Sequence, residues 1–251
     1  MEPLVNQKNI EKTFLQMLPR HKQIIIDEWV LNFYDRLIKR LNFVAPLSKR
    51  RKNLQKKIQL CERIFNHKHF DYSFRLTSFY NNEFDDLLAN HAYKKIFINK
   101  MFTINITNNV LSTPVIKSTE KANLSEWILS REDISGCHSN ESKLIMNCFN
   151  AIPLPKCLMT IEKNNKNISC GIGILYNNYL GIFDVKTLTD FQNKGFGTSI
   201  IQNMLLWAKK QGANNAILYV NIENNNAINF YKNLGFQECY KFWLRYKSSI
   251  K

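Results

Sequence analysis

The clearest hydrophobic pattern lies in the second half of the chain, where short apolar runs alternate with turn-forming residues. Three successive runs, CLMTIEK, SCGIGILYN and YLGIFDVKT, predict three strands. The Asn-rich breaks at 164–167 and 177–178 are good turn formers. These strands are therefore expected to form an antiparallel meander.

A helix and a buried strand are predicted next. The helix lies over GTSIIQNMLLWAKKQG, with Gly212 just past its end. Its apolar face is formed by Ile200, Ile201, Met204, Leu205 and Ala208. The run AILYVN is almost continuously apolar, as in a strand that is buried on both faces. A short helix over NNNAINFYKNLGF and a last strand over QECYKFWLRY complete the order β-β-β-α-β-α-β.

The first half predicts a further α/β unit. One helix has a buried stripe formed by Leu54, Ile58, Cys61 and Phe65. The runs YSFRLTS and YKKIFINKMFTINI predict strands, with a short helix over NEFDDLLANHA between them. Residues 107–123 are rich in Asn, Ser and Thr and have no lasting period, so we interpret them as a linker. The chain is predicted to hold two units, 1–106 and 124–251.

Composition narrows the class of protein. Hydrophobic residues make up 45% of the chain, which argues against wholesale disorder. No apolar run reaches the ~20 residues of a membrane span, and no secretory signal is recognisable. The six cysteines are scattered without a C-x-x-C pair, as is typical of a reduced compartment, and no metal site is predicted from them. We expect a cytoplasmic protein that does not act at a membrane.

The charge leaves two interpretations open. The formal net charge is +15, and its densest cluster is KRRKNLQKK, from Lys49 to Lys57. Such a run is either a solvated helix face or a patch for nucleic acid or a membrane surface. Aromatic residues are not interleaved with it as stacking on single strands requires, so the solvated face is favoured.

The loop TDFQNKGFGTSII places Gly195 and Gly197 where the predicted helix begins. A helix N-terminus offers unpaired N–H groups and a positive dipole end, which together bind phosphate. The two glycines let the backbone approach a ligand closely and permit positive φ. The Lys194 ammonium and the Thr198 hydroxyl can add a charge and a donor. The loop therefore predicts a pyrophosphate cradle, although neither the P-loop motif nor a full G-x-G-x-x-G is present.

The spacing beyond this loop is more specific. From Val220 to Phe236 the chain reads V-x-x-x-N-x-x-A-x-x-x-Y-x-x-x-G-F, and Q-x-x-G-x-G precedes it from Gln192. Over residues 125–251 these two motifs, in this order, resemble the GNAT superfamily of acyl-CoA-dependent N-acetyltransferases. The resemblance implies the GNAT fold, an α/β (α+β) architecture with a mixed, mostly antiparallel sheet and flanking helices.

The whole chain resembles bacterial two-module GNAT proteins. The runs EWVLNFYDRLIKRLNFVAPL, YSFRL and FDDLLANHAY look like their degenerate first module. Residues 1–106 hold neither of the two motifs, so no cofactor site is expected there. This module is expected to shape the acceptor pocket and to cover the second module, residues 124–251.

The resemblance implies that acetyl-CoA lies where the strands YLGIFDVKT and AILYVN splay apart. The backbone of Val185, Lys186 and Thr187 would pair with the pantetheine arm. The pyrophosphate would be held by the loop residues Gln192, Asn193, Lys194, Gly195, Phe196, Gly197 and Thr198. Asn224 and Ala227 would lie at the cofactor's amide region. Tyr231 would bind near the thioester sulfur and protonate the departing thiolate.

Each of these roles has a structural alternative. The Tyr231 ring could simply pack on the sheet, and Asn224 could cap a helix. Asp184 is the preferred general base and Glu162 a second candidate, but either could be a paired structural acid. The sequence departs from the usual GNAT pattern at Thr187 and Thr189, where Val and Pro are common, and Gln192 stands in place of Arg.

The sequence therefore predicts an N-acetyltransferase acting on an unidentified amine acceptor, either a small molecule or a protein. A catalytically silent acetyl-CoA-binding or scaffold protein is the first alternative, because many folds keep ligand sites without chemistry. A nucleic-acid-binding protein that uses the basic first half is a weaker one. Whether the protein is a monomer or a homodimer is left open.

Overall fold

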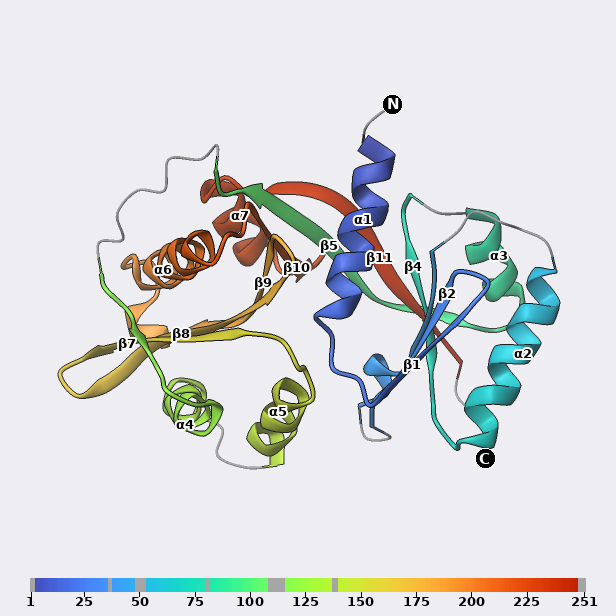
Figure 1. Cartoon of the computed structure of the whole chain (residues 1–251), viewed down its shortest axis with the longest axis horizontal. Helices are drawn as coiled ribbons and strands as arrows, with labels where there is room; N and C mark the ends of the chain where they lie inside the picture. The colour runs from blue at the N-terminus through green and yellow to red at the C-terminus, as the bar shows by residue number, and fades with distance from the viewer. Residues whose placement is uncertain are drawn as a thin grey trace.

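A single mixed sheet runs through the described part of the chain. The computed structural model describes residues 3–35, 38–47, 53–79, 82–107, 116–136 and 140–247. Its 11 strands follow the order β1-β2-β3-β4-β11-β5-β10-β9-β8-β7-β6. Among them only the pairs β3–β4 and β9–β10 are parallel, so the sheet is mixed and mostly antiparallel, as predicted. Helices lie on both sides of it (Figure 1).

The first half supplies the strands at one end of the sheet. Its elements are α1 (Pro3–Gln16), β1 (Lys22–Ile26), β2 (Trp29–Phe33), η1 (Lys39–Leu41), β3 (Phe43–Pro46), α2 (Leu54–His67), β4 (Ser73–Thr77), α3 (Asn82–Asn90) and β5 (Lys94–Asn105). On α2 the predicted stripe is turned inward, since Ile58, Cys61 and Phe65 are buried. The charged run before it is described only from residue 53 onward, where Lys57 pairs with Asp27.

The second half has the predicted order of strands and helices from β7 to β11, and β6, α4 and α5, which were not predicted, precede it. Its elements are β6 (Thr119–Glu120), α4 (Leu124–Ser135), α5 (Asn140–Asn150), β7 (Lys156–Lys163), β8 (Lys166–Tyr176), β9 (Tyr179–Thr187), η2 (Thr189–Phe191), α6 (Phe196–Lys210), β10 (Asn215–Asn221), α7 (Asn225–Asn233) and β11 (Gln237–Tyr246). The β7-β8-β9 meander turns at residues with positive φ, such as Asn164, Asn165 and Asn177, which suit tight hairpins.

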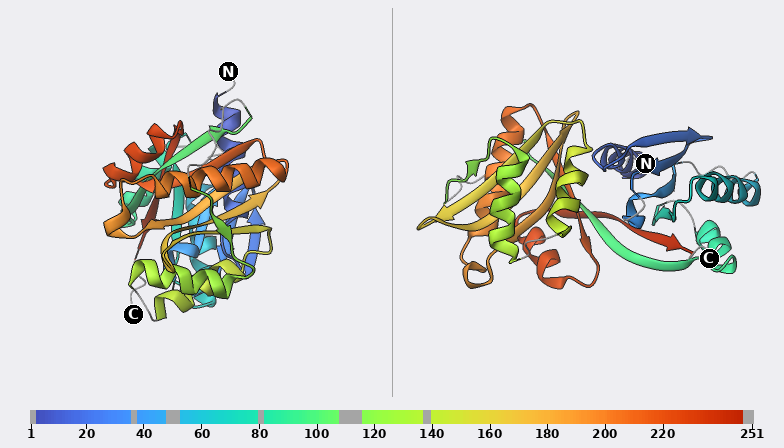
Figure 2. Two further views of the ribbon diagram at one scale, coloured as in Figure 1. Left: turned by 90° about the vertical axis from the view of Figure 1, so that its left-hand side faces the viewer. Right: turned by 90° about the horizontal axis from the view of Figure 1, so that it is seen from below.

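The strands from the two halves are interleaved. β5 lies between β10 and β11, and β11 pairs with β4 on its other side. In Figure 2 these long strands run from one half of the molecule to the other. Within the predicted linker, β6 pairs with the edge of β7, and residues 108–115 lie outside the described part. The sheet is therefore continuous across the two sequence units.

Close packing of α6 on the sheet depends on small residues in β8. A Cβ added to Gly171 would lie 2.9 Å from Ile200 Cγ2 and 3.0 Å from Met204 Sδ. All five residues of the predicted apolar face of α6 are buried. α6 and α7 cover one face of this part of the sheet, and α4 and α5 cover the other (Figure 1). Gly212 follows the helix with φ 85°, as its predicted place past the C-terminus requires.

A buried polar network connects α1 to β4 and β11, a pair of strands that come from the two halves. Arg75 Nε donates to Glu11 Oε1 at 2.6 Å, and Tyr240 Oη donates to Glu11 Oε2 at 2.6 Å. All three residues are buried. The charge of Glu11 is thus balanced inside the protein, as a buried carboxylate requires.

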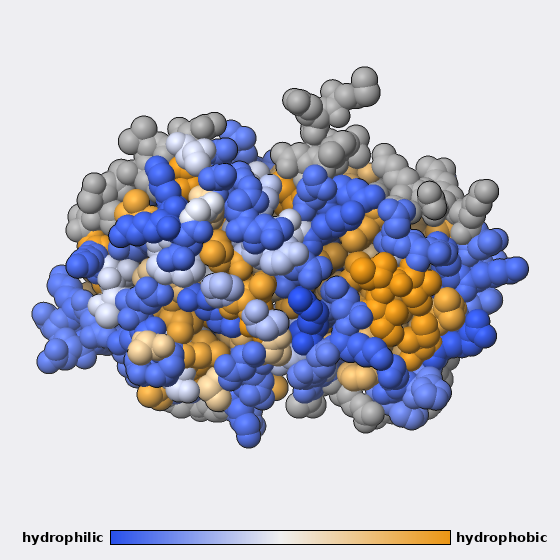
Figure 3. Space-filling view, in the orientation of Figure 1, coloured by the Kyte–Doolittle hydropathy of each residue, from blue (hydrophilic) through white to orange (hydrophobic). Residues whose placement is uncertain are grey.

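The view in Figure 3 is largely hydrophilic, with hydrophobic residues gathered over β1 and β2. Ile25, in the edge strand β1, is 68% exposed. No helix of the described residues is both long and apolar enough to cross a bilayer.

Candidate active site

A cleft of about 770 Å³ opens where β9 and β10 part. The two strands are paired only from Asn215↔Tyr179 to Ile217↔Gly181. Beyond this point the ladder between β8 and β9 shifts register, and Asp184 has a φ of 47°. This is a β-bulge, which bends a strand and ends regular pairing. β9 and β10 therefore separate as the sequence predicted.

The predicted cofactor residues gather at this cleft. All of them line it except Lys194 and Phe196, namely Val185, Lys186, Thr187, Gln192, Asn193, Gly195, Gly197, Thr198, Asn224, Ala227 and Tyr231. They come from β9, from the loop before α6 and the first turn of that helix, and from α7 with its N-cap. Elements separated along the sequence thus meet around one space of ligand size.

The loop before α6 presents unbonded amides to the cleft. The first backbone bond at this end of the 15-residue helix is from Ser199 N to Gly195 O, at 2.9 Å. The N–H groups of Phe196, Gly197 and Thr198 make no backbone hydrogen bond within the described chain. They lie at the positive end of the helix dipole, so they can bind an anionic group such as a phosphate.

The two glycines of this loop differ in what they permit. Gly195 has a φ of 84°, a left-handed conformation that residues with a side chain rarely adopt, and nothing lies within 4 Å of an added Cβ. Gly197 does not have a positive φ. Its added Cβ would meet Phe230 Cζ at 3.4 Å and Thr187 Oγ1 at 3.5 Å. Gly195 is thus required for the turn, whereas a Cβ at position 197 would make only ordinary van der Waals contacts.

The side chains of Lys194 and Phe196 lie outside the lining of the cleft. Lys194 Nζ donates to Asp190 O at 2.8 Å and lies 5.6 Å from the centre of the Phe191 ring, so the ammonium group is directed at η2. The Phe196 side chain is buried against Phe191, at a centroid distance of 5.6 Å. The buried Phe196 can therefore offer only its backbone to a ligand, and the Lys194 ammonium group is engaged with η2. Gln192 Nε2 also binds within the protein, to Thr187 O at 3.2 Å.

Tyr231 packs against neighbouring rings and also lines the cleft. Its ring packs edge-on against Phe230 and Phe236, with centroids 5.0 and 5.7 Å away. Burial raises the pKa of Tyr231 to about 12. Its hydroxyl has no hydrogen-bond partner among the residues that the structure describes, and the residue lines the cleft. The ring is thus held by packing while a protonated hydroxyl is left for a ligand.

Asn224 is the N-cap residue of α7. Its Oδ1 accepts a hydrogen bond from Ala227 N at 3.0 Å, which confirms the capping interpretation. Because Asn224 lines the cleft and its Nδ2 has no partner within the described chain, the same side chain can also donate to a ligand.

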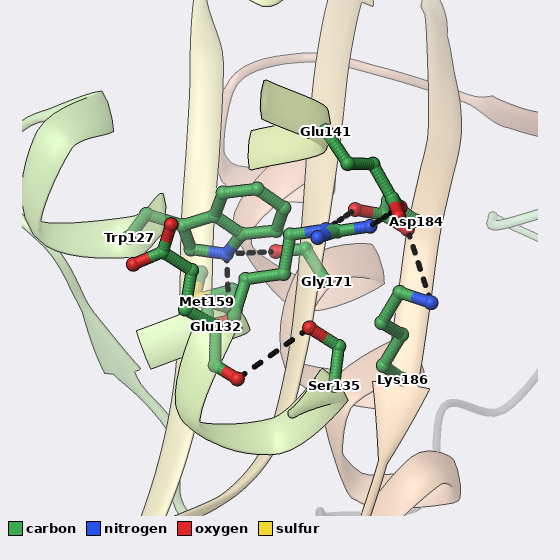
Figure 4. Close-up of polar contacts among 9 residues, drawn as sticks. Trp127, Glu132, Ser135, Glu141, Met159, Gly171, Asp184 and Lys186 are labelled. Carbon is green, nitrogen blue, oxygen red and sulfur yellow. Dashed lines mark hydrogen bonds and ion pairs between the residues drawn. The ribbon is translucent and has the colours of Figure 1, made fainter. Parts of the chain in front are cut away.

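The two candidate bases are both ion-paired. Asp184 Oδ2 accepts from Nε of Arg131, whose side chain is only 2% exposed, and Asp184 Oδ1 lies 3.9 Å from Lys186 Nζ. Arg131 also reaches Glu141 Oε1 at 3.1 Å (Figure 4). Glu162 pairs with Lys121 at 2.6 Å. The contacts favour the structural-acid interpretation for both carboxylates, and no described Asp, Glu or His lines the cleft.

A second cavity of about 340 Å³ lies beyond Asp184. Its walls are residues 17–19 and 40–41 from the first half, together with residues of α4, α5, β9 and β10. Lys186 lines both this second cavity and the cleft, so the two spaces adjoin. The sequence held no motif for Arg40, Arg131 or Glu141 here, because contacts between distant segments bring them together.

The model of the acetyltransferase (GNAT) family matches residues 124–236. That segment contains β9, the loop, α6, β10 and α7, and so the entire cleft. Residues 124–236 belong to the GNAT family.

Comparisons with individual proteins agree with this GNAT assignment. The chain is 47% identical over 58 residues to an uncharacterized N-acetyltransferase of Methanocaldococcus jannaschii, covering 22% of this chain and 26% of that protein. It is 24% identical over 169 residues to an uncharacterized N-acetyltransferase of Bacillus subtilis, covering 65% of this chain and 68% of the relative. The chain thus spans about a quarter of the first relative's length.

The fold match extends beyond the GNAT domain. The structure of a GCN5-related N-acetyltransferase from Kribbella flavida superposes with a TM-score of 0.71 at 12% identity, covering 99% of this chain and 96% of that one. The likeness therefore includes the first half, whose architecture recurs together with a GNAT domain. The predicted GNAT fold is confirmed.

Proposed function

We propose that this protein is an acetyl-CoA-dependent N-acetyltransferase that acts on a primary amine by direct attack. One observation carries the proposal: a single cleft joins the unbonded amides of α6 to the hydroxyl of Tyr231, along a strand freed from its neighbour. The amides suit a pyrophosphate, the free strand suits an extended amide-bearing arm, and the tyrosine suits a leaving thiolate.

The residues present fit acetyl-CoA. Phe196, Gly197 and Thr198 would donate their N–H groups to the pyrophosphate, and Gly195 would keep them pointed at it. The Val185 backbone would pair with the pantetheine amides past the bulge, and Asn224 Nδ2 would donate to a pantetheine carbonyl. Bound acetyl-CoA supplies a thioester carbonyl, which a neutral amine can attack without any covalent link to the enzyme.

Tyr231 would provide the proton for the thiolate. Because burial raises its pKa to about 12, its hydroxyl stays protonated at neutral pH and can serve as an acid. No described carboxylate or imidazole lines the cleft to take the proton of the amine. We therefore propose that the amine loses its proton to water, with Asp184 helping to shape the bulge through its pair with Arg131.

The same lack of a base in the cleft favours the second candidate, a GNAT domain that binds acetyl-CoA without catalysis. Two measurements separate these functions. Acetyl-CoA should raise the melting temperature, since a ligand at 100 Kd stabilises the native state by about 2.7 kcal/mol. Product formation from acetyl-CoA with a panel of amines should then be detectable by mass spectrometry. Binding without product supports the silent protein, and no thermal shift at millimolar acetyl-CoA removes both.

Tyr231→Phe tests the catalytic step itself. The substitution keeps the ring and its packing, so acetyl-CoA affinity and melting temperature should stay close to wild type. The single-turnover rate should fall by about 10²–10⁴-fold, as expected for a lost positioned acid. Tyr176→Phe, which removes a hydroxyl outside both the cleft and the second cavity, is a matched control. Single-turnover rates for Tyr231→Phe within about twofold of wild type would assign the proton to water or another group.

A further inference from the structure

The second cavity is placed where an acceptor would have to bind. We propose that it binds the acceptor, and that the acceptor is a small amine with an apolar body and a carboxylate, which Arg40 recognises. This inference rests on the proposed acetyltransferase function. Its basis is the position of the cavity, the balance of charges around it, and its size.

The second cavity adjoins the cleft along β9. Lys186 is shared by the cleft and the second cavity, and Asp184 lies two residues before it on β9. An amine bound in the second cavity can therefore approach a thioester in the cleft along β9. The opposite wall comes from the first half, through residues 17–19 and through Arg40 and Leu41 of η1. Both halves are thus needed to enclose the acceptor.

The charges of the cavity leave a positive surplus. Both carboxylates that line it, Asp184 and Glu141, are bound by Arg131. Lys186 adds a second cation 3.9 Å from Asp184. Burial raises the pKa of Cys148, so this lining thiol contributes no charge at neutral pH. With three cations against two carboxylates, the cavity is electrostatically unsuited to a polycationic amine.

Arg40 carries the cation that no described group neutralises. Its guanidinium carbon lies 5.9 Å from the centre of the Phe97 ring, and it makes no ion pair with any residue that the structure describes. A planar guanidinium in a cation–π contact keeps its N–H groups available, and they match a carboxylate in a bidentate manner. On the other wall, Arg131 Nη1 is buried without a partner, so that residue also retains a donor.

The remaining wall is apolar and the space is small. Its hydrophobic side chains include Leu18, Ile145, Phe149, Phe183 and Tyr219. A volume of about 340 Å³ is near the lower limit of ligand pockets, which suits a single small molecule. The nearby cations also favour the neutral form of the amine, because like charge disfavours protonation. The neutral amine is the form that attacks the thioester, so an amine bound in this form needs no base in the cleft.

Matched pairs of acceptors test the inference. Each pair consists of an amino acid and the amine that lacks its carboxylate: phenylalanine with phenethylamine, and leucine with isopentylamine, with spermidine as a polycation. At saturating acetyl-CoA, kcat/KM should be at least tenfold higher for an amino acid than for its amine, and spermidine should be poorest. Tenfold corresponds to about 1.4 kcal/mol.

Variants of Arg40 test whether this residue causes the preference for amino acids over the matched amines. Arg40→Gln should raise KM for the amino acids by about tenfold to a hundredfold, the usual range for a charge-assisted hydrogen bond. It should leave kcat/KM for the matched amines and the thermal shift by acetyl-CoA unchanged, and Arg40→Lys should recover part of the loss. Arg63→Gln removes the same charge from the exposed face of α2 and should behave as wild type.

Three results would overturn the inference while the proposed function stands. These are a thermal shift by acetyl-CoA with preference for the amines or spermidine, an amino-acid preference that survives Arg40→Gln, and acetylation of other amines with no amino acid acetylated. Absence of the thermal shift would instead overturn the proposed function. The two failures are therefore distinguishable.

Discussion

Replacing Gly195 with alanine should weaken the binding of acetyl-CoA, and the structure provides a matched control at the other end of the same helix. Gly195 precedes α6 with φ 84°, and Gly212 follows it with φ 85°. Both are exposed, and neither has a heavy atom within 4 Å of an added Cβ. Alanine at either position therefore meets the same backbone strain and the same open space. Only Gly195 lines the cleft.

The expected change in the Kd for acetyl-CoA follows from the backbone conformation at the two glycines. A left-handed conformation costs an L-residue about 1–2 kcal/mol relative to glycine. At Gly212 this cost should appear as lost stability alone. At Gly195 an exposed loop can relieve the strain by turning its amides away, and a ligand must then restore their geometry. The Kd for acetyl-CoA should rise by about 5- to 30-fold, because each 1.4 kcal/mol is tenfold.

Calorimetric titration with acetyl-CoA and thermal unfolding of both variants are the assays. We expect Gly212→Ala to bind as wild type with a lowered melting temperature, and Gly195→Ala to bind more weakly. If the two variants and the wild type shared one Kd, the amides after Gly195 would have no part in binding. The pyrophosphate would then have to lie elsewhere.

Further predictions concern charge, burial and pH. Gly197→Glu should abolish the thermal shift by acetyl-CoA while the protein still folds. Gly197→Gln has equal bulk and should bind acetyl-CoA better than the glutamate variant, because it lacks the repelling charge. Equal loss of binding in both variants would leave side-chain bulk as the only cause. Tyr240→Phe should lower the free energy of unfolding, measured by urea titration, by about 1–3 kcal/mol, because Glu11 loses a buried donor. Tyr246→Phe removes an exposed hydroxyl and should change this free energy little. Because burial raises the pKa of Tyr231 to about 12, the neutral tyrosine is favoured in the folded protein. Single-turnover rates should therefore show no loss from its ionisation between pH 8 and about 10. A fall in rate over this pH range that disappears in Tyr231→Phe would contradict the raised pKa.

Local patterns were enough to predict much of this protein. The order from β7 to β11 follows from runs of apolar residues, from Asn-rich turns and from Gly212, each of which acts within a few positions of the chain. The residues that line the cleft were also predictable, because the motifs containing Gln192, Asn224 and Tyr231 resemble those of the GNAT superfamily.

The tertiary structure decided which segments meet. Nothing in β5 specifies that it lies between β10 and β11, because any apolar strand can hydrogen-bond to any other and the choice depends on the whole sheet. The pairing of Asp184 with Arg131 of α4 is likewise a tertiary contact, and so is the direction of the Lys194 ammonium group toward a carbonyl of η2. The second cavity exists only because η1 and the end of α1 face α4, α5 and β9. Side-chain charges act through space, so their partners, and with them the chemistry of the acceptor, emerge only once distant segments are packed together.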